Sequence, residues 1–214
     1  MSNSQDAADQ SPFASRKDLA AVERDIWQTL VRAVDDRALG WRLPVVATRS
    51  SRGVRQRIVV LRDVDAERRT MLVHTDARSP KVEQMEADDR VSILFYDSEL
   101  AVQLSVTATA RIHTDDEVAQ NLWDASHPLS LKYCLGPQAP GTPSDKPDFN
   151  LPERWIDEQP SRAELDAVRE RFAVLEFSVR RIDWLSLART GNLRAAFEYT
   201  PDHPDAVSRE WLAP

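Results

Sequence analysis

One stretch of strict alternation constrains the fold more than any other feature of this chain. Every second residue is apolar along Leu100, Val102, Leu104, Val106, Ala108, Ala110 and Ile112. Because successive side chains of a strand point to opposite faces, the pattern predicts a long strand with one buried face and one solvated face. The chain must therefore build a sheet around this strand.

Other segments supply neighbouring strands and a few helices. Apolar or β-branched runs predict strands at residues 43–48, 57–64, 70–75, 91–96, 172–182 and 193–199. Apolar spacing and capping residues predict helices at residues 17–36, 79–87, 114–126 and 161–171. Strands and helices do not alternate as in a parallel βαβ sheet. The order favours an α+β, mainly β fold: a barrel with flanking helices.

The chain reads as one domain with two appended segments. Residues 1–15 are polar and acidic and predict a disordered lead, residues 16–200 predict the domain, and residues 201–214 predict a C-terminal tail. Within the domain, residues 137–160 hold six of the thirteen prolines. A loop of this length in a compact domain is typically functional or mobile.

Composition argues against several kinds of site. A net charge of −7 disfavours general nucleic-acid binding, and the single cysteine, Cys134, excludes an internal disulfide or a cysteine-based zinc site. No apolar run approaches the ~20 residues that cross a bilayer, and no signal peptide is recognisable. His113 begins no metal-binding spacing, and glycine-rich nucleotide loops are absent. We expect a cytoplasmic protein without a metal, a nucleic-acid partner or a membrane segment.

Two segments concentrate cations and hydroxyls. The first is a strand that runs from Arg57 to Arg62 through four apolar residues. The second, from His74 to Lys81, leaves a strand and enters a helix, and it carries Thr75, Arg78 and Ser79. A helix N-terminus offers unpaired N–H groups, and arginine and lysine add positive charge, so the second segment suits a phosphate. The alternative is an ordinary strand-to-helix turn with solvated charges.

Together with a long strand that has Gln103 near its start, these motifs resemble the pyridoxamine 5′-phosphate oxidase-like flavoproteins. The resemblance extends from about Trp27 to Tyr199 without the proline-rich loop, and residues 181–187 are similar to the C-terminal portion of one subgroup. It implies a six-stranded split β-barrel that forms a homodimer, with two molecules of flavin mononucleotide (FMN) bound at the subunit interface.

By matching positions, the resemblance implies a cofactor site made of side chains and backbone from both segments. Arg57 and Arg62 would face the phosphate and ribityl chain, and the backbone of Val59, Val60 and Leu61 would run beside the flavin ring. Thr75, Ser79 and Lys81 would complete the phosphate cradle, with His74 and Arg78 in the same turn. Gln103 would reach the ring from the partner subunit, and Gln138 would approach it from the loop.

The departures from the family pattern concern mainly the substrate. Pro80 stands where the oxidases carry an arginine, and Arg78 is expected to replace that charge. The vitamin B6 oxidases hold their substrate with an Arg-x-His pair, where this chain has Asn192-Leu193-Arg194, and Ser126 and Ala196 replace two further arginines. Ser130 and Arg194 are the candidate substrate residues. A housekeeping vitamin B6 oxidase is not expected.

Two functional classes follow. Flavin performs the redox step itself, so no catalytic acid, base or nucleophile is expected in the chain. The first class is an FMN-dependent oxidoreductase that acts on an unidentified small molecule, with oxygen or a nicotinamide as its partner. The second is a flavin- or haem-binding protein without turnover, such as a sensor, store or carrier. A deazaflavin user and a barrel that has lost its cofactor also remain open.

Overall fold

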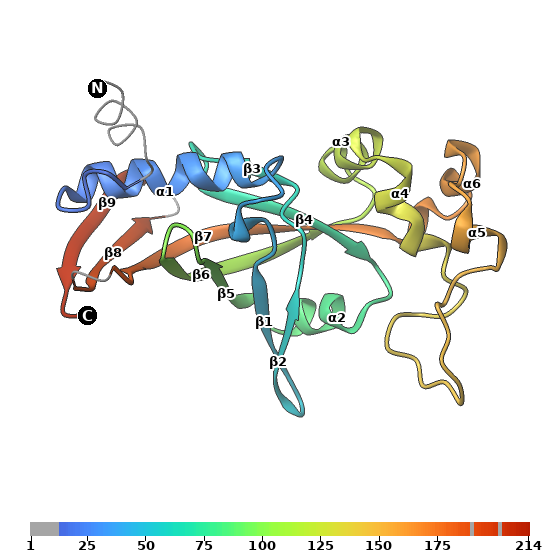
Figure 1. Cartoon of the computed structure of the whole chain (residues 1–214). Coiled ribbons are helices and arrows are strands. Elements are labelled where there is room, and N and C mark those ends of the chain that lie inside the picture. Colours follow the sequence, from blue (N-terminus) through green and yellow to red (C-terminus); the bar gives the residue numbers. More distant parts are fainter. Residues whose placement is uncertain (1–12, 189–190, 201–202) are drawn as a thin grey trace, which may run out of the picture. The chain divides into compact units, whose positions relative to one another are not determined.

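The computed structural model describes residues 13–188, 191–200 and 203–214 (Figure 1). They form two compact units. Unit 1 comprises the described residues up to Leu72, Arg90–Thr109 and the residues from Phe177 onward, and unit 2 comprises Val73–Asp89 and Ala110–Glu176. Three strands run through both units: β4 (Thr70–Asp76), β6 (Val102–His113) and β7 (Phe172–Ser186).

The described strands form a nine-stranded sheet in the order β2-β1-β5-β6-β7-β4-β3, with β8 paired to β7 and β9 paired to β8. The strands not yet given are β1 (Val45–Ser50), β2 (Gly53–Ile58), β3 (Asp63–Asp65), β5 (Arg90–Asp97), β8 (Leu193–Thr200) and β9 (His203–Leu212). The pairs β1–β2, β1–β5, β3–β4, β5–β6, β7–β8 and β8–β9 are antiparallel. This is the expected α+β, mainly β class.

The alternating strand builds the core of unit 1. In β6, Val102, Leu104 and Val106 are buried, whereas Ser105 and Thr107 are exposed. Directly opposite residues of an antiparallel pair share a face, and the β5 residues opposite Leu104 and Val106 are the buried Phe95 and Ile93. The alternation therefore predicted the buried face correctly from Val102 to Ala108. At its two ends the prediction was wrong, because Leu100 precedes the strand and Ala110 and Ile112 are only half-buried.

Helix α1 (Leu19–Ala33) contacts β3 and β9 of the same unit. Asp18 caps it, because its carboxylate accepts the backbone N–H groups of Ala20 and Ala21. One stripe of the helix is buried, including Val22, Ile26 and Leu30. The short 3₁₀ helix η2 (Gly40–Arg42) leads from this region into β1.

Unit 2 carries the other helices, which are short. They are α2 (Pro80–Ala87), α3 (Glu117–Ala125), α4 (Pro128–Leu131), α5 (Arg154–Asp157), α6 (Arg162–Asp166) and the 3₁₀ helices η3 (Lys132–Leu135) and η4 (Arg169–Arg171). Their shared core contains Trp123, whose ring meets Phe172 edge to face at a centroid distance of 5.1 Å. The Trp123 indole N–H donates to Asp166 at 3.1 Å. No helix of the described residues is long and apolar enough to cross a membrane.

Three expectations about elements need correction. The strand over residues 57–64 is interrupted, because β2 ends at Ile58 and β3 begins at Asp63. In the interval the backbone N–H groups change partners, from the carbonyls of Pro44 and Arg42 to that of Leu72. The helix over 161–171 divides into α6 and η4, and the segment 201–214, expected as a tail, contains β9.

The segment expected as a disordered lead, residues 1–15, also differs from the prediction near its end. Phe13 is buried, and its ring lies 6.0 Å from the rings of both Trp41 and Trp184. Residues 1–12 lie outside the described part of the chain. Aromatic contacts therefore hold the end of this segment against unit 1.

Candidate functional site

The turn between β4 and α2 gathers one cation and two hydroxyls. Lys81 Nζ donates to Thr75 Oγ1 at 2.7 Å and to Ser79 Oγ at 2.8 Å. Thr75 lies near the end of β4, and Ser79 is the N-cap of α2, with Pro80 in the first helical position. The Ser79 hydroxyl makes no capping bond to α2, so it is directed to Lys81 instead. We call Thr75, Ser79 and Lys81 the hydroxyl–lysine cluster.

The cluster has the chemistry of a small-anion site. Lysine brings a full positive charge, and hydroxyls can donate to an anion once an ammonium group holds their oxygens. The first turn of α2 adds the positive end of its dipole, while Pro80 has no N–H and the Val82 N–H already donates to the Ser79 carbonyl at 2.9 Å. The structure thus brings together three of the residues that sequence reasoning assigned to a phosphate.

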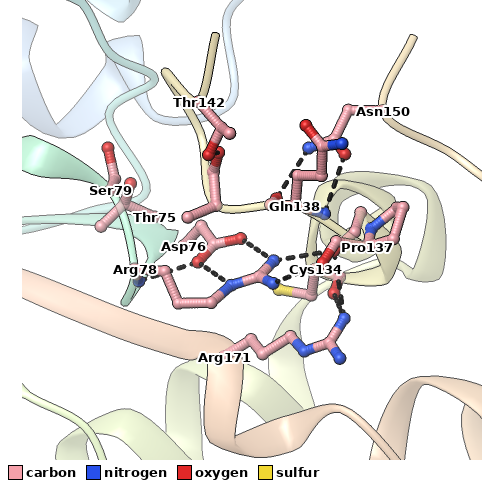
Figure 2. Close-up of polar contacts among 12 residues, drawn as sticks. Thr75, Asp76, Arg78, Ser79, Cys134, Pro137, Gln138, Thr142, Asn150 and Arg171 are labelled. Carbon is pink, nitrogen blue, oxygen red and sulfur yellow. Dashed lines mark hydrogen bonds and ion pairs between the residues drawn. The ribbon is translucent and has the colours of Figure 1, made fainter. Parts of the chain in front are cut away.

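Arg78, from the same turn, is engaged differently (Figure 2). Its Nε and NH2 atoms donate to the two carboxylate oxygens of Asp76 at 3.0 and 2.7 Å, and Asp76 is only 2% exposed. The hydrogen bond to Asp76 raises the pKa of Arg78 above its usual value. The same guanidinium donates to the carbonyls of Gly136 at 2.9 Å and Pro137 at 3.4 Å. Arg78 therefore ties the turn to the start of the proline-rich loop.

The base of that loop is fastened a second time (Figure 2). Asn150 Oδ1 accepts the Gln138 N–H at 3.1 Å, and Asn150 Nδ2 donates to the Gln138 carbonyl at 2.9 Å. Arg171 NH1 donates to the carbonyls of Cys134 and Gly136 at 3.2 and 3.1 Å. A Cβ on Gly136 would lie 2.8 Å from Asn150, so glycine is required for this approach. Gln138 is thus fixed by its backbone, and its side chain is exposed.

His74, one residue before Thr75, lies in an aromatic cluster of unit 2. Its ring stacks on Tyr133 at 5.6 Å and an angle of 22°, and the Tyr133 hydroxyl lies 3.0 Å from His74 Nδ1. Phe172 packs on the histidine from 5.5 Å. Sequence reasoning missed Tyr133, because nothing in the short helices around it carries a recognisable motif. The neighbouring Cys134 is buried, which raises its pKa to about 12, so its thiol stays protonated.

The candidate residues from the first segment lie in unit 1. Arg57 of β2 donates to the Val46 carbonyl at 3.2 Å and to Thr48 Oγ1 at 2.7 Å. Burial, and then the charge of Arg55, lower the pKa of Arg57. The next candidates along the chain are Val59, Val60, Leu61 and Arg62. Leu61 is buried, and the other three are half-buried.

Gln103 lies on the outward face of unit 1. It is directly opposite Tyr96 in the β5–β6 pair and is half-buried, while its neighbours Val102 and Leu104 point into the core. The same face carries Leu94, which is 41% exposed, and Tyr96, which is 51% exposed. A glutamine in this position can reach a group that approaches the sheet from outside.

The two candidate substrate residues lie in different units. Ser130 is a half-buried residue of α4 in unit 2. Arg194 of β8, in unit 1, donates to both carboxylate oxygens of Asp183 at 2.9 and 2.8 Å. That hydrogen-bonded pairing raises the pKa of Arg194. The charge of Arg194 is therefore balanced within unit 1. Across the described residues, no group of three His, Cys, Asp or Glu side chains is placed to hold a metal ion.

Solved structures show the same fold at low sequence identity. A pyridoxamine 5′-phosphate oxidase-related, FMN-binding protein from Nostoc punctiforme matches with a TM-score of 0.64 and 19% identity over 95% of this chain and 98% of its own. PhzG from Burkholderia lata, solved with tetrahydrophenazine-1-carboxylic acid, matches with a TM-score of 0.64 and 15% identity over 95% of this chain and 97% of its own. No curated protein matches the sequence.

The sequence itself also matches a family model. The model is that of pyridoxamine 5′-phosphate oxidase, and it matches residues 40–182, more than half of the 214-residue chain. The match covers the hydroxyl–lysine cluster, Arg57 and Gln103. The fold is accordingly the split-barrel fold of these proteins, and the chain belongs to the pyridoxamine 5′-phosphate oxidase family.

Proposed function

We propose that this protein binds FMN and uses it as an oxidoreductase on a small molecule. The observation that carries the proposal is the hydroxyl–lysine cluster at the start of α2, with Lys81 held 2.7 and 2.8 Å from two hydroxyl oxygens. A phosphomonoester needs such a set of cations and neutral donors. Membership of the family, and the FMN-binding relative from Nostoc punctiforme, support FMN as the source of that phosphate.

The residues present fit this cofactor. Thr75, Ser79 and Lys81 of unit 2 would hold the phosphate, and the family resemblance assigns Arg57, half-buried on β2 of unit 1, to the phosphate and ribityl chain. When bound, FMN supplies the electron-transfer chemistry. The chain's own contribution is to orient the ring and to exclude water. Gln103 is the side chain that we expect to donate to the ring.

The substrate is proposed to be a small molecule other than pyridoxine phosphate. Arg194 belongs to the segment that matches the substrate-binding Arg-x-His pair of the vitamin B6 oxidases. Its guanidinium donates two hydrogen bonds to Asp183, whose carboxylate balances its charge. An arginine in this state attracts an anionic substrate less than an unpaired one would. The bound ligand of PhzG, a tricyclic carboxylic acid, supports a small organic molecule as the substrate class.

Replacing Lys81 tests the cofactor site. We expect Lys81→Ala to weaken FMN binding by about 100-fold, because it removes a charge-assisted contact worth about 2–3 kcal/mol. The measurement is calorimetric titration of apoprotein with FMN. Lys146→Ala is the matched control, since it removes the same charge from an exposed loop position of the same unit. Equal FMN affinity in the two variants would count against the cluster.

Turnover is tested separately on the FMN-loaded protein. Bleaching of the flavin absorbance by NADH or NADPH, followed by recovery in air, is the expected result for the enzyme. A flavin that binds but is not reduced by either nicotinamide would favour the sensor, store or carrier, and a Soret band after addition of haem would favour the haem-binding alternative.

We also propose that the protein is a homodimer with FMN at the interface. The outward face of β2, β1 and β5 supports this, because Ile58, Val45 and Leu94 lie opposite one another in register, and Ile58 is 65% exposed. Exposed apolar side chains gathered on one sheet face are typical of an interface. Leu94→Asp should therefore give monomers in analytical ultracentrifugation and weaken FMN binding, whereas Val31→Asp, at an exposed position of α1, should give dimers.

The cytoplasm is the proposed location. A single cysteine with a buried thiol suits a reducing compartment.

A further inference from the structure

A second pocket, separate in its residues from the proposed cofactor site, lies in unit 1. It has a volume of about 630 Å³ and is formed by α1, the turn between β3 and β4, and β9. None of the residues proposed to bind FMN or substrate lines it. Pockets of this volume are of the size that takes a small organic ligand.

Charge is the unusual property of this pocket. Four arginines line it, namely Arg24, Arg32, Arg69 and Arg209, against one glutamate, Glu23, which leaves a surplus of three positive charges among the lining residues. Asp25, which does not line the pocket, lies 4.0 Å from Arg24 Nε and balances part of that charge. The whole chain has a net charge of −7. A concave cationic surface on an acidic protein attracts anions while the rest of the surface repels them.

The inner wall of the pocket is held rigidly. Glu23, 4% exposed, accepts from Arg209 Nε at 2.7 Å and pairs with Arg69 NH2 at 3.2 Å. The Arg69 guanidinium also lies 5.0 Å from the Trp27 ring centroid and 5.2 Å from that of Tyr199. Because these contacts join α1, β9 and the turn before β4, the wall exists before any ligand arrives.

The outer wall is a row of exposed side chains on α1. Arg24, Gln28 and Arg32 are spaced four residues apart and are all exposed, so they lie along one side of the helix. Trp27 and Val31 lie beside them in the lining. The pocket thus places forked donors next to exposed aliphatic surface, with the nearly buried Trp27 behind it, a combination that can hold an anion with an apolar body.

We infer that this pocket binds a small organic anion, a carboxylate, sulfonate or phosphate attached to an aromatic or aliphatic group. Arg24 and Arg32 would grip the anionic group, and Val31, which is 45% exposed, would contact the apolar body. Arg69 and Arg209 stay paired with Glu23 and preserve the shape of the pocket.

Fluorescence titration of the purified 214-residue chain tests the inference with two related probes. Anilinonaphthalene sulfonate carries the anion, and phenylnaphthylamine is its uncharged analogue. We expect the sulfonate to bind more tightly than the analogue and the double variant Arg24→Gln/Arg32→Gln to weaken sulfonate binding by about tenfold or more, since water screens the contacts of these two exposed arginines. The control, Arg37→Gln/Arg52→Gln, removes the same charge from exposed positions of unit 1 that do not line the pocket.

A gain-of-charge variant keeps the test independent of any loss of folding. Gln28→Arg adds a cation at an exposed position between the two arginines and should tighten sulfonate binding. Equal sulfonate affinity in the two double variants, no effect of Gln28→Arg, or equal binding of the charged and uncharged probes would each overturn the inference.

Discussion

Both units bury a carboxylate against arginine, but they use the pair differently. In unit 1, Glu23 is shared between Arg69 and Arg209, two residues far from it in sequence. In unit 2, Asp76 is bound by Arg78, two residues further along, and the remaining donors of Arg78 reach backbone carbonyls of the loop. The first arrangement joins secondary-structure elements, and the second joins a turn to a loop.

The charge balance of the two regions differs as well. One carboxylate for two arginines leaves unit 1 with surplus positive charge beside a pocket. Asp76 balances Arg78 one for one, so Lys81 supplies the positive charge of the neighbouring hydroxyl–lysine cluster. In each region, therefore, a buried carboxylate fixes the position of the arginines that pair with it.

Removing the carboxylate of unit 1 should have the largest effect. Glu23→Gln leaves Arg69 and Arg209 facing each other without a counter-charge, and breaking a buried pair costs about 3–5 kcal/mol. We expect about 3 kcal/mol of lost unfolding free energy, because both arginines are partly exposed and water screens part of the repulsion. Urea denaturation measures this loss.

Glu67→Gln is the control for this variant, since it removes an exposed glutamate of the same unit. If Glu23→Gln is as stable as Glu67→Gln, the ion cluster of Glu23, Arg69 and Arg209 does not stabilise unit 1.

Removing the carboxylate of unit 2 should cost less stability. Asp76→Asn preserves an acceptor for the Arg78 backbone N–H but removes the charge that holds the guanidinium. We expect a loss of about 2 kcal/mol, together with weaker FMN binding, because the turn that carries Ser79 and Lys81 loses its tie to the loop. Thermal melting and FMN titration measure the two effects, with the exposed loop variant Asp145→Asn as control. A loss larger than that of Glu23→Gln would reverse the proposed ranking of the two regions.

The two regions also differ in how far the sequence predicted them. Arg78, Ser79 and Lys81 lie within a few residues of one another, so the turn that joins them was recognisable as one motif. Glu23, Arg69 and Arg209 are brought together only by the packing of α1 against β9 and the β3–β4 turn. The strand β9 was missed because its polar, proline-containing sequence has no regular apolar alternation, and its pairing with β8 is a tertiary effect.

The role of Arg78 shows a further limit. Its position in the motif predicted a charge for the phosphate, and the sequence gives no sign that Asp76 and the carbonyls of Gly136 and Pro137 would bind its guanidinium. By contrast, the buried face of β6 from Val102 to Ala108 followed directly from alternation, since periodicity is a local property.

The smallest effect is expected from loss of the two hydrogen bonds between Asn150 and Gln138, which close the proline-rich loop at its base. Asn150 has a φ of 52°, a conformation that asparagine tolerates better than alanine. Asn150→Ala should lower the free energy of unfolding by about 1 kcal/mol, because it introduces backbone strain and removes the two bonds to Gln138. Asn150→Gly removes the same bonds, but glycine adopts this positive φ without strain. Limited proteolysis is the measurement, because both variants should be cut faster between residues 138 and 150 than the wild type. If only the alanine variant is cut faster, backbone strain rather than the two bonds to Gln138 controls the loop, and Arg78 and Arg171 would then be the residues that fasten its base.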